Sequence, residues 1–170
     1  MSTHQRAGGG TATDLTARIS SHPFFAALVP HHLGALRETC TPVSYPQGAR
    51  LFTEGGPADH FWLLEHGDVA LDLQVPGHGA LVLETLPAGT LLGWSWLCPP
   101  YRWHFGAVAR TAVTTLRFDA GLVLRRCEAD PSFGYAMMRL VTPVIIDRLQ
   151  ATRLRLLDLY GPPGGRRRQR

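Results

Sequence analysis

The spacing of apolar positions changes twice along this chain. Residues 14–40 show helical spacing, with Pro30 at a position where a helix can begin. Residues 41–119 instead form short apolar or alternating runs, which are typical of strands. Helical spacing then returns over residues 120–160, with Pro131 at the start of the longer of two helical segments.

Turns rich in glycine and proline separate the predicted strands. They are Pro46-Gln47-Gly48, Gly55-Gly56-Pro57, His66-Gly67-Asp68, Pro76-Gly77-His78-Gly79 and Pro87-Ala88-Gly89. Glycine suits such turns because tight connections often need positive φ. The pattern predicts an α+β fold: an antiparallel β-roll, similar to a jelly-roll barrel, flanked by N-terminal helices and a long C-terminal helix.

The 170 residues are expected to form one domain over residues 14–160. Residues 1–13 are rich in glycine and residues 161–170 in arginine, and both tails are predicted to be disordered. No run approaches 18 apolar residues, and the first residues lack the apolar stretch of a secretory signal. We therefore expect a cytoplasmic protein with no membrane partner.

The net charge of +4 comes from the C-terminal tail, through Arg166, Arg167, Arg168 and Arg170. The remainder of the chain is therefore close to neutral, and it predicts no basic face for nucleic acid.

The last helical segment carries a heptad seam. Its members are spaced 4, 3, 4 and 3 residues apart, and they are Ile145, Leu149, Thr152, Leu156 and Leu159. Charged residues, Arg148 and Arg153 among them, are expected to flank the seam. This pattern predicts a homodimer through the helix at about 131–160, and the alternative is that the helix packs only on its own domain.

No catalytic or metal-binding motif is present. The three cysteines, Cys40, Cys98 and Cys127, form no CxxC pair, and the eight histidines lack the spacing of metal ligands. Sequences such as GxSxG, the P-loop and HExxH are absent. We expect neither an enzyme nor a metalloprotein.

Two stretches resemble cyclic-nucleotide-binding domains of the Crp/Fnr regulator type. The first carries the family's tyrosine-proline-x-glycine start, glutamate-glycine turn and apolar strands, through Tyr45, Pro46, Gly48, Phe52, Glu54, Gly55, Asp59, Leu63 and Gly67. The second, LPAGTLLG, matches the approach to the ligand cassette through Leu86, Gly89 and Gly93. RLQATRLRLL resembles the family's long C-terminal helix. The resemblance covers about residues 22–160.

The resemblance implies a β-roll that encloses a small ligand next to Gly93. In the family a glutamate binds the ribose hydroxyl and an arginine binds the cyclic phosphate. This chain has Trp94 at the glutamate position, and Arg102 fills the arginine position only if the loop shifts by one residue. We therefore expect no ordinary binding of cyclic AMP.

Three tryptophans in residues 93–105 leave two hypotheses open. In one, they line a pocket for a nucleotide-like or flat anionic small molecule. The predicted ligand-binding residues are then Gly93, Trp94, Ser95, Trp96, Arg102, Trp103, His104 and Thr152. In the other, they fill the pocket themselves.

The first hypothesis predicts a non-catalytic sensor or regulatory protein, and the second a ligand-free scaffold for dimerisation and protein–protein interaction with an unidentified partner. Only ten residues follow Tyr160, so no helix-turn-helix and no sequence-specific nucleic-acid partner are expected.

Overall fold

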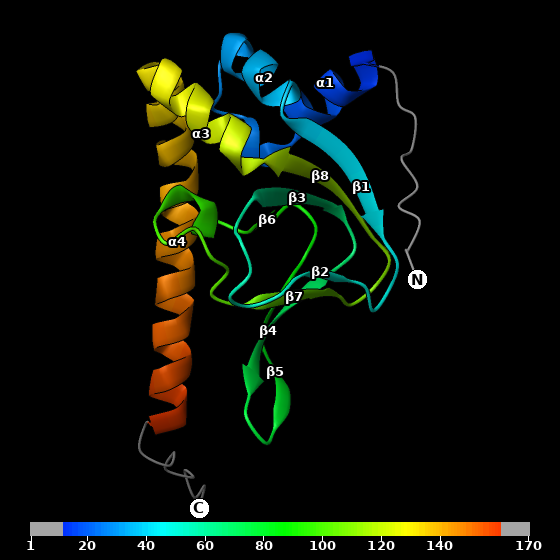
Figure 1. Ribbon diagram of the computed structural model, residues 1–170, viewed down its shortest axis with the longest axis vertical. Coiled ribbons are helices and arrows are strands. Elements are labelled where there is room, and N and C mark those ends of the chain that lie inside the picture. Colours follow the sequence, from blue (N-terminus) through cyan, green and yellow to red (C-terminus); the bar gives the residue numbers. More distant parts are fainter. Residues whose placement is uncertain (1–11, 161–170) are drawn as a thin grey trace, which may run out of the picture.

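The computed structural model describes residues 12–160, and it begins with three helical segments (Figure 1). They are α1 (Ala12–Ser21), η1 (Pro23–Phe25) and α2 (Pro30–Arg37). α1 begins inside the predicted N-terminal tail, while residues 1–11 and 161–170 lie outside the described residues. Cys40, which the helical spacing assigned to the face of a helix, begins the first strand instead.

Eight strands form two four-stranded antiparallel sheets. One sheet has the order β1-β8-β3-β6 and the other the order β2-β7-β4-β5. The strands are β1 (Cys40–Tyr45), β2 (Arg50–Phe52), β3 (His60–His66), β4 (Val69–Val75), β5 (Gly79–Leu86), β6 (Leu91–Leu92), β7 (Gly106–Ala109) and β8 (Val113–Asp119). The predicted β-roll is confirmed, including the hairpin between β4 and β5, which projects from the body of the roll (Figure 1).

A row of aromatic rings joins the β-roll to the N-terminal helices. Phe61 of β3 stacks on Trp96 at 4.9 Å and on Phe118 of β8 at 4.8 Å, measured between ring centroids. Phe118 meets Phe25 of η1 edge to face at 5.6 Å. All four side chains are at most 1% exposed, so this row is the centre of the core.

Two helices follow the strands, as predicted. Asp119 begins α3 (Ala120–Ala129), because its carboxylate accepts a hydrogen bond from the backbone N–H of Leu122 at 2.8 Å. Asp130 has the same role before α4 (Pro131–Tyr160), and it accepts from the N–H of Ser132 at 2.9 Å. The hydroxyl of Ser132 also donates to Asp130, at 2.7 Å, and this hydrogen bond contributes most to the lowered pKa of Asp130.

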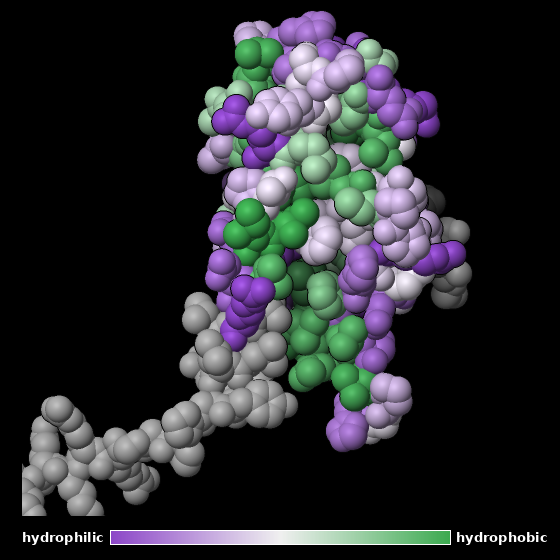
Figure 2. Space-filling model, turned by 90° about the vertical axis from the view of Figure 1, so that its left-hand side faces the viewer, coloured by the Kyte–Doolittle hydropathy of each residue, from purple (hydrophilic) through white to green (hydrophobic). Residues whose placement is uncertain are grey.

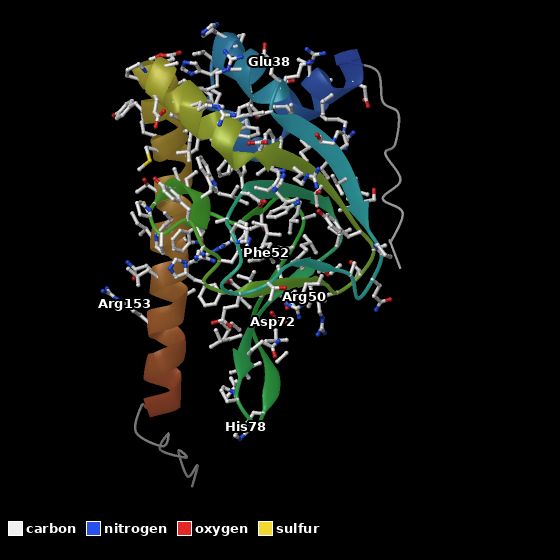
Figure 3. The ribbon with its side chains drawn as sticks, viewed as in Figure 1. Glu38, Arg50, Phe52, Asp72, His78 and Arg153 are labelled. Carbon is white, nitrogen blue, oxygen red and sulfur yellow. The ribbon has the colours of Figure 1, made fainter. Side chains whose placement is uncertain are left out.

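A bidentate ion pair joins two strands of the second sheet. Arg50 of β2 donates to both carboxylate oxygens of Asp72 of β4, at 2.9 and 2.6 Å (Figure 3). β7 lies between these two strands, and Gly106 at its start has no side chain to block the pair. The Asp72 side chain is 3% exposed, so its negative charge depends on Arg50.

We predict that Arg50→Met lowers the free energy of unfolding by about 3 kcal/mol, because it leaves a buried carboxylate without its cation. Urea unfolding measures the change. Arg110→Met, at an exposed arginine after β7, is the matched control and should change stability by less than about 0.5 kcal/mol. Equal effects of the two substitutions would contradict this account of the ion pair.

Candidate functional site

The segment that we call the cassette, residues 93–104, leaves the first sheet directly after β6. Gly93 makes the turn with φ of 80°, and the short helix η2 (Ser95–Leu97) follows. Residues 101–103 then return along residues 55–58. There the N–H of Trp103 donates to the carbonyl of Gly56 at 2.9 Å, and the N–H of Ala58 donates to the carbonyl of Tyr101 at 2.8 Å.

The indole of Trp103 lies inside the β-roll and is only 4% exposed. It stacks on Phe52 with ring centroids 4.1 Å apart and planes 22° apart. Phe52 in turn stacks on Trp62 of β3 at 5.3 Å. A Cβ atom at Gly93 would lie 2.9 Å from the Trp103 ring, so the missing side chain of Gly93 provides the space for the indole.

The space left beside Trp103 is a cavity of about 20 Å³. Its lining residues are Phe52, Leu71, Gly93, Trp94, Ser95, Trp103, His104, Phe105 and Arg148. A volume of this size holds about one water molecule, whereas sites for small organic ligands usually measure about 300 Å³ or more. In this conformation the cassette has no room for a nucleotide.

Five of the predicted ligand-binding residues gather around this cavity: Gly93, Trp94, Ser95, Trp103 and His104. The rings of Trp94 and His104 stack with centroids 6.1 Å apart. The hydroxyl of Ser95 lies 3.2 Å from Nδ1 of His104. The part of the cavity wall formed by Ser95 and His104 is therefore polar, while the Trp103 side is aromatic.

Two of the predicted residues, Trp96 and Arg102, do not line the cavity. Trp96 belongs to the aromatic row of the core, and its indole N–H has no hydrogen-bond partner among the described residues. Arg102 is exposed, and its guanidinium donates to the carbonyl of Gly55 at 2.8 Å. The side chain of Thr152 lies outside the described part of the chain.

Arg148 of α4 is the cationic residue of the cavity wall, and sequence reasoning missed it. Its Nη2 donates to the carbonyl of Leu91 in β6 at 2.5 Å. Burial lowers the pKa of Arg148, and the nearby carboxylate of Glu84 opposes that shift. Helical spacing in the sequence could have identified Arg148, because Phe133, Met137 and Arg148 share the face of α4 that is directed toward the domain.

Among the described residues, the outer face of α4 exposes several large apolar side chains. Figure 2 shows apolar side chains gathered along α4 and over the β4–β5 hairpin. On α4 they include Met138, Ile146 and Leu149, which are 47%, 49% and 52% exposed. Of the predicted seam, Ile145 is partly buried against the core, and the side chains of Thr152, Leu156 and Leu159 lie outside the described residues.

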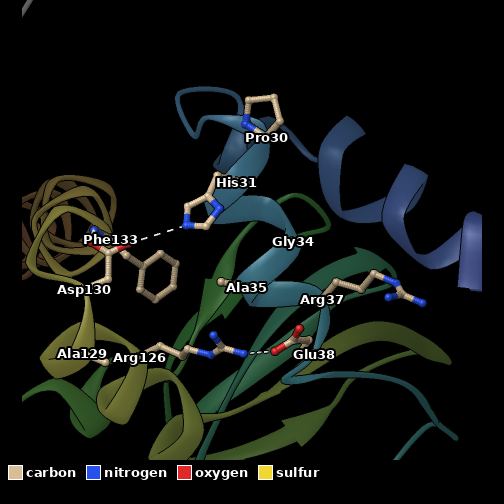
Figure 4. A pocket seen from close by; sticks show the side chains of 10 residues that line it. All are labelled: Pro30, His31, Gly34, Ala35, Arg37, Glu38, Arg126, Ala129, Asp130 and Phe133. Carbon is tan, nitrogen blue, oxygen red and sulfur yellow. Dashed lines mark hydrogen bonds and ion pairs between the residues drawn. The ribbon is translucent and has the colours of Figure 1, made fainter.

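A larger hollow of about 580 Å³ lies between α2 and the junction of α3 with α4 (Figure 4). Phe133 and Ala35 line it. Arg126 forms an ion pair with Glu38 across it, and Nε2 of His31 lies 3.9 Å from a carboxylate oxygen of Asp130. Because both carboxylates already have partners within this chain, we interpret the hollow as a packing groove between helices.

The described residues contain no group of three or more histidine, cysteine or acidic side chains that could hold a metal ion. Cys40 is half-buried, and burial raises its pKa to about 12. None of the helices in residues 12–160 is both long and apolar enough to cross a membrane.

A family model described as cyclic nucleotide-binding domain matches residues 42–130. The chain belongs to the cyclic nucleotide-binding domain family. This match confirms the resemblance that the glycine spacing predicted.

Among curated relatives, the domain is 26% identical over 136 residues to the "CRP-like cAMP-activated global transcriptional regulator" of Mycobacterium tuberculosis, covering 79% of this chain and 58% of the regulator. It is 30% identical over 148 residues to "Glutaminase 1" of Bradyrhizobium diazoefficiens, covering 85% of this chain and 23% of that protein. The domain thus spans little more than half of the regulator and about a quarter of the glutaminase.

A solved structure of a cyclic nucleotide-binding domain from Methylobacillus flagellatus superposes with a TM-score of 0.72 at 16% identity, covering 89% of this chain and 85% of that one. At this identity the likeness supports the fold alone. The fold and the family match together make this chain a cyclic nucleotide-binding domain similar to those of regulatory proteins.

We predict that Gly93→Ala destabilises this cyclic nucleotide-binding domain by about 3 kcal/mol, since it combines an unfavourable positive φ with a clash against Trp103. Trp103→Ala should cost about 3–5 kcal/mol through loss of a buried indole. In the Trp103→Ala background, Gly93→Ala should cost only about 1 kcal/mol, because the clash is gone while the backbone strain stays.

Urea unfolding of the four proteins in this double-mutant cycle measures the coupling free energy. Additive effects of the two substitutions would show that the indole does not occupy the space beside Gly93.

Proposed function

We propose that this domain is a non-catalytic regulatory module whose cassette is filled by its own tryptophan, so that it acts without a cyclic nucleotide. The observation that carries the proposal is the burial of Trp103 between Phe52 and Gly93, with a remaining cavity of about 20 Å³. The indole is an aromatic group held where the family resemblance puts a ligand.

Two further features support a cassette that does not bind cyclic nucleotides. Trp94 stands where the resemblance expects a carboxylate for the ribose hydroxyl, and an indole can only donate one hydrogen bond. Arg102 is directed to the backbone of Gly55 and away from the cavity wall. A nucleotide would therefore lose hydrogen bonds to water without regaining them, which typically costs several kcal/mol.

We predict that titration of the protein with cyclic AMP or cyclic GMP produces no binding heat in a calorimeter at ligand concentrations up to the millimolar range. The tryptophan fluorescence should stay unchanged in the same titration. Saturable uptake of either nucleotide by the wild-type protein would overturn the proposal.

A second candidate function is a sensor for a flat anionic small molecule that displaces Trp103. The polar side chains on one side of the cavity, Ser95, His104 and Arg148, favour it, because anion sites need hydrogen-bond donors. Fluorescence titration with aromatic carboxylates such as indole-3-carboxylate tests this candidate. The second candidate function predicts saturable quenching of the tryptophan fluorescence in the wild-type protein.

The same proposal includes association of two copies of the domain through the outer face of α4. The exposed apolar side chains on that face, among them Ile146 and Leu149, support it, since large apolar patches on a surface are typical of interaction sites. Charged residues such as Asp147 and Arg153 lie on the same segment, as in helices that pair in water.

We predict a dimer in sedimentation velocity at tens of micromolar protein. Leu149→Glu should shift the species to a monomer, because it places a carboxylate in an apolar contact. Gln150→Glu adds the same charge at the neighbouring exposed position and should leave the dimer intact. A wild-type monomer, or a dimer that Leu149→Glu leaves unchanged, would contradict association through this face.

A further inference from the structure

Within the described side chains, the face of α4 that packs on the domain carries one charged residue where an apolar residue would be expected. Phe133, Met137 and Val141 are at most 1% exposed and follow each other at intervals of four residues. Val144 continues this face against the core, and Arg148 is the next position on it. A methionine or leucine there would cover the same surface without the cost of removing a guanidinium from water.

The Arg148 side chain is linked to three segments of the β-roll. It donates to the carbonyl of Leu91 in β6, it lines the cavity beside Ser95 of the cassette, and it interacts electrostatically with Glu84 of β5. Leu91 lies only two residues before Gly93, whose turn makes room for Trp103. The Arg148 side chain therefore binds the strand that leads into the cassette and lines the same cavity as cassette residues.

Pro143 lies between the buried part of α4 and Arg148. A proline has no N–H, so the carbonyl of Arg139 lacks its usual partner and the helix is weakened at this point. Beyond Arg148 the described side chains are exposed or half-buried, and Figure 3 shows that Arg153 is directed away from the β-roll. After Pro143 the described part of the helix thus meets the domain through Val144, Ile145 and Arg148.

We propose that Arg148 is the positioning residue that holds the segment of α4 after Pro143 against the cassette, and that loss of the packed cassette conformation releases this segment. The proposal rests on the proposed function in one respect: the packed conformation is the one in which Trp103 fills the cassette. It adds a route by which the cassette controls the apolar face that carries Ile146 and Leu149.

Hydrogen–deuterium exchange with mass spectrometry on the full chain tests this role. Arg148→Met keeps the length of the side chain and removes the charged donor. We expect exchange of the amides in residues 144–153 to rise about tenfold, since losing a hydrogen bond from a charged donor changes an opening equilibrium by about that factor. Amides of β3 and β8 should keep their wild-type rates.

Arg153→Met is the matched control, because it removes the same charge from an exposed arginine five residues later. It should leave the exchange of residues 144–153 unchanged. Equal exchange in the two variants would overturn the proposal. A uniform rise over the whole chain in Arg148→Met would overturn it too, because it would indicate general destabilisation.

The double variant Trp103→Ala/Arg148→Met tests the link to the cassette. If loss of the indole already releases the helix, Arg148→Met should add less than twofold to the exchange of residues 144–153 in that background. A full tenfold addition would refute the link. The outcome is independent of the nucleotide titrations, so failure of the proposed function and failure of the Arg148 role can be told apart.

Discussion

The contact between Trp103 and Phe52, with ring centroids 4.1 Å apart, is the interaction on which the site depends. Both rings are large and flat, and their stacking removes an apolar surface from water while filling the interior of the roll. Gly93 makes the contact possible, because any side chain at this position would overlap the indole. Packing density, more than loss of individual ligand contacts, therefore decides what the cassette can bind.

The two buried tryptophans of the cassette have different roles because Trp96 lies within η2, whereas Trp103 lies in the returning segment of residues 101–103. Trp96 extends a row of rings through Phe61 and Phe118 toward the N-terminal helices, so it anchors the cassette to the core. Trp103 fills the space between Phe52 and Gly93, on the side where the family resemblance puts a ligand. A cassette anchored on one side and filled on the other has little freedom to move, which fits a module that responds to partners more than to nucleotides.

α4 connects this site to the surface of the molecule. Its inner face carries Phe133 and Met137 into the core and then presents Arg148 to the cassette, while its outer face exposes Ile146 and Leu149. A single helix thus has one face that packs on the β-roll and another that exposes apolar side chains.

Local patterns in the sequence determined the elements, because turn glycines such as Gly48 and Gly67 and the change between strand and helix spacing act over a few residues. They also identified the family and the position of the cassette next to Gly93. Tertiary structure alone decided which tryptophan fills the cavity and that Arg102 is directed outward. It also decided that Arg148 donates a hydrogen bond to Leu91, which lies 57 residues earlier in the chain. These outcomes depend on packing between distant segments, and no periodicity within one segment carries that information.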